Sequence, residues 1–244
     1  MRYAVISDIH ANLEAFQAVL DRIAGLRIDR ILCLGDIVGY NPDPNACIEL
    51  VREKQITSIL GNHDAVACGL ANPAAFNPLA YEAILWTERQ LAPESKRFLC
   101  SLPRELQMNE LFLCHGTIHD TNHYIMSLDD VRDAFRLMAE LPEKPRICLH
   151  GHSHLPSVFR FQNGVIAQEL GEHLTLSPSA NYLLNPGSVG QPRDGDPQAG
   201  FLVYDDADKT VTFFRVDYNR ETCQNKIIAA GLPVKLALRL ALGR

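Results

Sequence analysis

Five short polar segments, each placed directly after an apolar run, constrain this 244-residue chain more than any other feature. The apolar runs at 3–7, 30–34 and 56–60 are compact and are closed by Gly or Asp, which is typical of buried strands. Because ligands bind beyond the carboxyl ends of strands in an open α/β sheet, we expect the five segments to lie at one edge. In sequence letters the segments are DIH at 8–10, GDIVG at 35–39, GNHD at 61–64, HG at 115–116 and GHSH at 151–154.

Helical patterns separate these strands. Apolar residues recur at helical spacing, and capping residues or Pro stand where such stretches begin. Strands that alternate with helices are typical of α/β units. One helix is predicted between a cap at Asn12 and an end at Gly25, one from Pro44, one over 77–102, and one over 129–141 with Ser127 and Asp130 as its capping pair.

Strand patterns dominate from Glu105 onward and are arranged as hairpins. The turns are expected at Asn109-Glu110, at Asn163-Gly164 and at 205–209. These elements predict an α/β (α+β) fold, in which two sheets form a β-sandwich flanked by helices on both sides.

The chain, residues 1–244, is expected to form a single domain, in which 219–244 is a C-terminal extension of two helices broken at Gly231 and Pro233. The apolar face of these helices is expected to pack on the body of the protein or on a second copy of the chain. A homo-oligomer therefore remains an open alternative.

Charge and cysteine content narrow the function classes. The formal net charge is −6 and the sequence pI is about 5.8, so the chain has no general attraction for nucleic acid or an anionic membrane. No apolar stretch approaches the roughly 20 residues of a membrane span, and the N-terminus lacks the apolar core of a secretory signal. Seven cysteines follow no disulfide or metal spacing, so we expect buried free thiols and a cytoplasmic protein.

The five polar segments are rich in metal-binding residue types. An Asp-x-His or His-x-His pair at a strand end can direct both side chains to one ion. Imidazole and carboxylate together suit Zn, Fe, Mn, Ni or Co better than Mg or Ca. Each motif alone is more often a surface turn or an ordinary histidine. Their order and shared position at strand ends favour a metal site.

The segments together resemble the calcineurin-like metallophosphoesterase superfamily, whose ordered motifs are DxH, GDxxG, GNH(D/E), a separate His and GHxH. All are present here without substitution, and Asn185-Pro186-Gly187-Ser188 resembles a further motif of its small bacterial phosphodiesterase branch. The resemblance implies a β-sandwich flanked by helices and a centre that holds two divalent transition-metal ions.

The same resemblance implies a role for each matching residue. His63 would be the general acid that faces the leaving group, and Asp64 would orient it. Asp36 would bridge the two ions. One ion would be held by Asp8, His10, Asp36 and His154, and the other by Asp36, Asn62, His115 and His152.

The function implied is hydrolysis of a phosphate ester by a metal-bound hydroxide, either as a phosphodiesterase or as a phosphatase. The alternative is a non-catalytic, metal-binding interaction scaffold on the same fold. Arg193, Ser188 and Tyr40 are candidate substrate contacts, and His119 and His123 are weaker ones. The sequence does not choose among phosphodiesters, dinucleotides, phosphoproteins and cyclic nucleotides.

Overall fold

The computed structural model describes residues 1–244 and contains two six-stranded sheets. The strands of the first sheet lie in the order β3 (Thr57–Ser58), β2 (Arg30–Cys33), β1 (Arg2–Ile6), β11 (Ala199–Asp205), β12 (Thr210–Val216) and β9 (His173–Thr175). This sheet is mixed, because β1 pairs in parallel with β2 and antiparallel with β11.

The strands of the second sheet lie in the order β4 (Leu106–Met108), β5 (Leu111–Leu113), β6 (Ile147–Leu149), β10 (Asn181–Asn185), β7 (Ser157–Gln162) and β8 (Val165–Glu169). This sheet is also mixed, since β6 pairs in parallel with β5 and β10 while β7 is antiparallel to β10. Two of the predicted hairpins, β4–β5 and β7–β8, lie in this sheet, and the third is β11–β12 in the first sheet.

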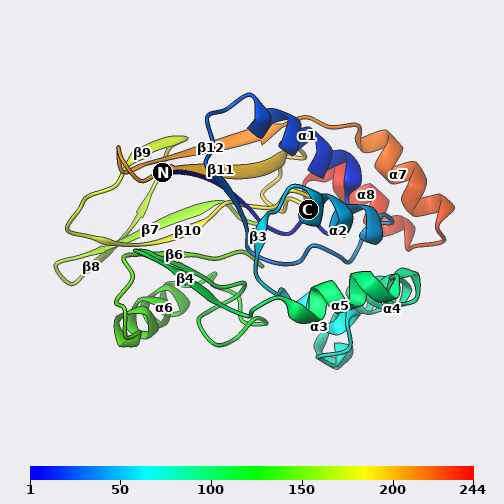
Figure 1. Cartoon of the computed structure of the whole chain (residues 1–244), viewed down its shortest axis with the longest axis horizontal. Coiled ribbons are helices and arrows are strands. Elements are labelled where there is room, and N and C mark those ends of the chain that lie inside the picture. Colours follow the sequence, from blue (N-terminus) through cyan, green and yellow to red (C-terminus); the bar gives the residue numbers. More distant parts are fainter.

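Alternate side chains of β1 show how the first sheet packs against the second sheet on one face and against helices on the other. Tyr3 and Val5 point into a core shared with the second sheet, whereas Ala4 and Ile6 point into a core shared with helices. The helices on that outer face are α1 (Leu13–Ala24) and α2 (Pro44–Glu53), and α6 (Leu128–Glu140) covers the second sheet (Figure 1). The predicted two-sheet sandwich flanked by helices on both sides is confirmed.

The local signals at helix ends also behave as predicted. The Asn12 side chain accepts a hydrogen bond from Ala15 N at 3.1 Å, and Gly25 follows the last turn of α1. Ser127 and Asp130 form a reciprocal capping box at the start of α6. The capping residues therefore predict both ends of α1 and the start of α6 correctly.

The helix predicted over 77–102 is two helices, α4 (Pro78–Gln90) and α5 (Pro93–Ser101). Leu91 and Ala92 are extended because Pro93 disfavours helical backbone in the residue before it and lacks an N–H for the preceding turn. Two helical segments were not predicted. They are the short helix α3 (Asn62–Ala67) and the 3₁₀ turn Pro73–Ala75.

The two C-terminal helices, α7 (Arg220–Ala229) and α8 (Val234–Leu242), are separated at Gly231 and Pro233 as predicted. They pack on the body of the protein beside α4 and Tyr40. None of the helices combines the length and the apolar content that a membrane span requires.

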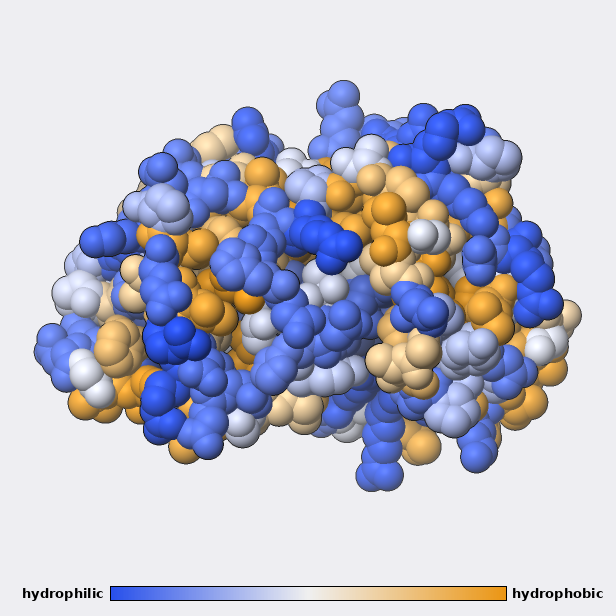
Figure 2. Space-filling model, turned by 90° about the horizontal axis from the view of Figure 1, so that it is seen from below, coloured by the Kyte–Doolittle hydropathy of each residue, from blue (hydrophilic) through white to orange (hydrophobic).

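One face of the molecule has hydrophilic residues across its middle and patches of apolar residues on either side (Figure 2).

The cysteines are unpaired, but the prediction that all are buried is wrong for two. Cys100 is exposed and Cys68 is half-buried, because α5 and the end of α3 lie at the surface. The other five are buried.

The loop after β10 is held tightly against the turn that follows β1. Gly190 N donates to Asp8 O at 2.9 Å, and a Cβ on Gly190 would lie 1.9 Å from Ile9 O. Because the obstacle is backbone, the loop can accept no side chain at this position without moving the Asp8 turn.

We expect Gly190→Ala to lower the free energy of unfolding by about 1 to 3 kcal/mol or more, because overpacking forces backbone shifts. Urea unfolding followed by circular dichroism measures this. Gly25→Ala is the matched control, since its φ is −79° and its added Cβ would meet Arg22 O at an ordinary 3.5 Å. Equal stability of the two variants would contradict the close approach.

Candidate metal centre

Sharp turns directly after the strands bring the polar side chains together. Five residues at these turns have left-handed backbone, namely Asp8 (φ 54°), His10 (48°), Asp36 (53°), His152 (65°) and His154 (59°). Such a conformation in a residue other than Gly costs about 1 to 3 kcal/mol and is concentrated at functional sites. The fold therefore maintains strained turns at the positions that carry the motif side chains.

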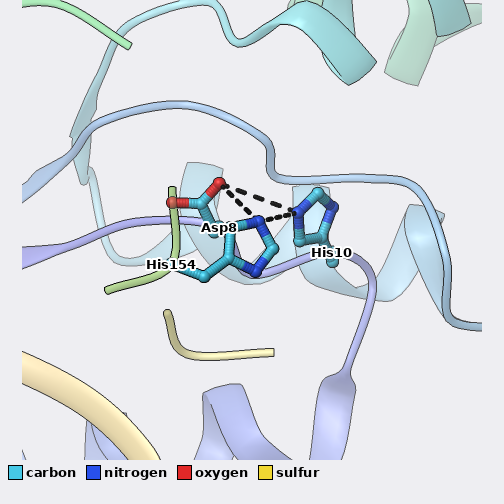
Figure 3. A group of neighbouring side chains, drawn as sticks. All are labelled: Asp8, His10 and His154. Atoms are coloured by element: carbon cyan, nitrogen blue, oxygen red, sulfur yellow. Dashed lines mark hydrogen bonds and ion pairs between the residues drawn. The ribbon is translucent and has the colours of Figure 1, made fainter. Parts of the chain in front are cut away.

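Asp8, His10 and His154 form one group (Figure 3). The Nε2 atoms of His10 and His154 are 3.1 Å apart, and Asp8 Oδ1 is 3.7 and 3.2 Å from them. All three side chains are buried, and Asp8 Oδ1 accepts no hydrogen bond. Three electron-pair donors that converge without a proton donor between them fit a cation.

Asp36, His115 and His152 form a second buried group. His115 Nε2 is 3.2 Å from Asp36 Oδ2 and 3.1 Å from Asn62 Oδ1. The same Asp36 Oδ2 is 3.7 Å from His10 Nε2 of the first group. Asp36 therefore lies between the two groups and is shared by them.

Backbone carbonyls fix the orientation of each imidazole. A ring whose one nitrogen donates to a carbonyl presents the lone pair of its other nitrogen, which is the usual arrangement of a metal-binding histidine. Three rings turn Nε2 inward in this way, and His152 turns Nδ1 inward. The bonds join Nδ1 of His10 to Val38 O (3.1 Å), Nδ1 of His115 to Leu34 O (2.8 Å), Nδ1 of His154 to Gln191 O (2.5 Å), and Nε2 of His152 to Asn122 O (3.1 Å).

Burial and neighbouring charges set the protonation of the centre. Burial raises the pKa of Asp36, but His115 and His63 outweigh it and hold that pKa well below its usual range. Burial lowers the pKa of His115, but Asp36 reverses the effect and raises it to about 9. Burial, followed by the charge of His115, lowers the pKa of His152 to about 3. The free centre thus holds carboxylates, a protonated His115 and neutral imidazoles around them.

His63 lies beside this centre on the first turn of α3. Its ring centroid is 4.6 Å from those of Tyr40 and Phe76 and 4.9 Å from that of His10, and its Nδ1 has no hydrogen-bond partner. Burial lowers its pKa to about 4. A buried imidazole with a free nitrogen is available for proton transfer to a ligand.

Asp64, predicted to orient His63, bonds to backbone donors in the structure. Its carboxylate accepts hydrogen bonds from Val38 N and Gly61 N, each at 3.1 Å, and no hydrogen bond joins it to the His63 ring. Burial, followed by the charge of Asp36, raises its pKa to about 7. Asp64 therefore joins the GDIVG loop to the start of α3 and acts on His63 only through the backbone.

Ser188, a candidate substrate contact, bonds to the backbone of two turns in the structure. It is buried, its hydroxyl donates to Asp8 O at 2.8 Å, and it accepts from Gln191 N at 2.8 Å. Asn185 of the same turn donates to Gly151 O at 2.8 Å and to Ser153 Oγ at 3.1 Å. The Asn-Pro-Gly-Ser turn therefore holds the Asp8 and GHSH turns in place.

Tyr40 and Arg193, two of the candidate substrate contacts, lie together at the rim of the centre. The Tyr40 ring packs against His10 with centroids 4.6 Å apart, and the Arg193 guanidinium is 5.9 Å from the Tyr40 centroid. Arg193 Nη2 donates to Gln191 Oε1 at 3.0 Å, while Arg193 Nε and the buried Gln191 Nε2 have no partner. Unpartnered N–H donors of this kind suit an anionic oxygen.

His119 and His123 lie away from the centre. Their imidazoles are more than half exposed and contact Glu105 and Asp130, each at 3.2 Å. The same loop instead supplies Tyr124, whose ring stacks on that of His152 with centroids 3.9 Å apart. No sequence pattern singles out Tyr124 or Gln191, because both lie in loops that no periodicity describes.

Comparison with known proteins agrees with this geometry. Residues 1–209 match the model of the calcineurin-like phosphoesterase superfamily domain. The chain belongs to the calcineurin-like phosphoesterase superfamily. This calcineurin-like chain is 38% identical over 246 residues to the uncharacterized protein MJ0912 of Methanocaldococcus jannaschii, a match that covers 99% of this chain and 98% of that protein.

Solved structures of the superfamily fold resemble the calcineurin-like chain throughout its length. A metallophosphoesterase from Sphaerobacter thermophilus is 38% identical, has a TM-score of 0.85, and is matched over 100% of this chain and 99% of its own. The hypothetical protein PH1004 from Pyrococcus horikoshii OT3 has a TM-score of 0.80 over 100% and 98% of the two chains, but at 20% identity it shows the fold alone. The predicted family and fold are confirmed.

We expect metal binding at pH 7 to release about one proton from His115. The reason is that the raised pKa keeps the His115 ring protonated in the metal-free protein, whereas only a neutral imidazole can bind an ion. The affinity should therefore rise with pH and level off above about pH 9. Calorimetry in two buffers of different ionisation enthalpy measures the proton release. Release that does not change between pH 7 and pH 9.5 would contradict the raised pKa of His115.

Proposed function

We propose that this chain hydrolyses phosphate esters with the help of two divalent transition-metal ions. The observation that carries the proposal is Asp36, a buried carboxylate shared by two groups of convergent imidazole and carboxylate donors. Membership of the calcineurin-like phosphoesterase superfamily supports the same reaction class.

The donor set supports two ions of the transition series. Nitrogen and oxygen donors together suit Mn, Fe, Zn, Ni or Co, and availability often decides among them. We propose Asp36 as the bridge. The proposed ligands are Asp8, His10, Asp36 and His154 for one ion, and Asp36, Asn62, His115 and His152 for the other.

Bound in these groups, the two ions would activate water and offset the negative charge of the phosphoryl oxygens. The residues of the chain supply what remains. Arg193 and Tyr40 are proposed to orient the phosphate from the rim. His63 is proposed to protonate the leaving oxygen, and because burial holds it neutral in the free site, the negative charge of a bound phosphate is needed to raise its pKa.

We expect Asp36→Asn to reduce hydrolysis of bis(p-nitrophenyl) phosphate more than 100-fold, because the amide removes the negative charge shared by both groups. Release of p-nitrophenol by protein loaded with Mn²⁺ or another divalent ion measures this, together with metal content. Asp21→Asn, at an exposed position of α1, is the matched control and should retain full activity. A wild-type protein that binds two ions yet hydrolyses no ester would favour the interaction scaffold instead.

We expect His63→Asn to retain both ions and to lose about 100-fold or more in kcat on esters with poor leaving groups. Activated aryl esters, which need less protonation of the leaving oxygen, should be affected far less. His173→Asn, which changes an exposed histidine on β9, controls for general effects. Unchanged turnover of alkyl phosphate esters by His63→Asn would remove His63 from the mechanism.

A further inference from the structure

A pocket of about 240 Å³ opens beside His63. Asn62 and His63 line it, and Tyr40, Phe76, Asn77 and Tyr124 are among the other lining residues. Because His63 is the proposed proton donor to the leaving oxygen, this pocket is where the leaving group would lie. The inference therefore rests on the proposed function.

Three aromatic rings from outside the five motifs line the pocket; Tyr40 packs on His10, and Phe76 and Tyr124 are the other two. Phe76, from the segment before α4, packs one face toward His63 at 4.6 Å with an interplanar angle of 38°. Tyr124, from the loop after His115, stacks on His152 at 3.9 Å with an angle of 21° and is still 40% exposed. Each ring is thus supported by an imidazole of the centre, and those of Phe76 and Tyr124 are available to stack on a flat ligand.

Besides the His63 imidazole and the hydroxyls of Tyr40 and Tyr124, the polar groups of the pocket are the uncharged amides of Asn62, Asn77 and Asn122. Asn77 uses its side-chain oxygen to accept from Ala80 N at 3.0 Å, which leaves its NH₂ group free to donate. Asn122 adds a further side-chain amide, and no Asp, Glu, Lys or Arg lines the pocket. Amides pair with the ring nitrogens and exocyclic groups of heteroaromatic rings, whereas a second phosphate would need cations.

The size of the pocket limits what it can enclose. Its volume lies below the roughly 300 to 1,000 Å³ of pockets for drug-sized ligands. One ring system fits, but an extended peptide segment does not.

We propose that this pocket binds a nucleobase carried by the leaving alcohol, so that the esters cleaved are those of nucleosides. Stacking between Phe76 and Tyr124 and hydrogen bonds from the amides of Asn77 and Asn122 hold the base. Because base–aromatic stacking strengthens binding, we expect the loss of either ring to weaken affinity roughly tenfold.

The experiment compares two substrates with the same leaving oxygen, adenosine 5′-phosphate and ribose 5-phosphate, each as the monoester and as its methyl diester. The metal-loaded wild-type protein should show a kcat/KM at least tenfold higher for the form that carries adenine. Tyr124→Ala should lower this preference about tenfold, and Tyr124→Phe, which keeps the ring, should preserve it. Tyr81→Ala is the matched control, because Tyr81 is an exposed aromatic residue of α4 outside the pocket.

Binding of adenosine alone, measured by ligand-observed NMR at millimolar concentration, separates this inference from the proposed function. Adenosine should bind the wild-type protein and Asp36→Asn alike, and should bind Tyr124→Ala about tenfold more weakly. Phe76 packs against two apolar cores, so Phe76→Leu serves there in place of Ala and should also weaken binding. Absence of adenosine binding, or equal kcat/KM for the two substrates, would overturn the pocket assignment even if hydrolysis is intact.

Discussion

Two buried carboxylates, Asp8 and Asp36, set the conditions that the rest of the structure must meet. Buried anions are costly unless cations or hydrogen-bond donors face them. Backbone donors meet part of this demand, since His152 N donates to Asp8 Oδ2 at 3.1 Å and His63 N donates to Asp36 Oδ1 at 2.9 Å. The remaining oxygens face imidazoles, Asp8 Oδ1 that of His154 and Asp36 Oδ2 that of His115.

The strained turns and the close glycines follow from that condition. A Cβ on Gly61 would lie 2.1 Å from Asp36 Oδ1, and one on Gly151 would lie 2.0 Å from Ser7 Oγ. The backbone at these two glycines must pass this closely so that the N–H groups of His63 and His152 can reach Asp36 and Asp8. A side chain at Gly61 or Gly151 is therefore excluded. The loop from Asn185 to Gln191 supports these turns: Ser188 donates to Asp8 O, Asn185 donates to Ser153 Oγ, and Gln191 O accepts from His154 Nδ1.

Sequence patterns predicted the parts of the structure that depend on local chemistry. The Asn12 cap, the Asn163-Gly164 hairpin and the break at Pro233 follow from backbone preferences of single residues. The break before Pro93 was missed because apolar periodicity continues across it. The bonds of Ser188 to Asp8 and Gln191 were not predicted, because a hydroxyl that supports a turn and one that contacts a ligand look the same in sequence. The pocket formed by Phe76 and Tyr124 depends on loops brought together by tertiary packing, which no local pattern encodes.

The C-terminal helix α8 packs against residues at the rim of the centre. Leu236, Ala237 and Leu240 of α8 share an apolar cluster with Tyr40, and Gly243 O accepts from Gly195 N at 2.9 Å in the loop that carries Arg193. The match to the superfamily model ends at residue 209, and both C-terminal helices lie beyond it. The loop that carries Arg193 is thus braced by a segment outside that match. Substitutions in α8 would therefore act on the positions of Tyr40 and Arg193 and leave the side chains of the two donor groups unchanged.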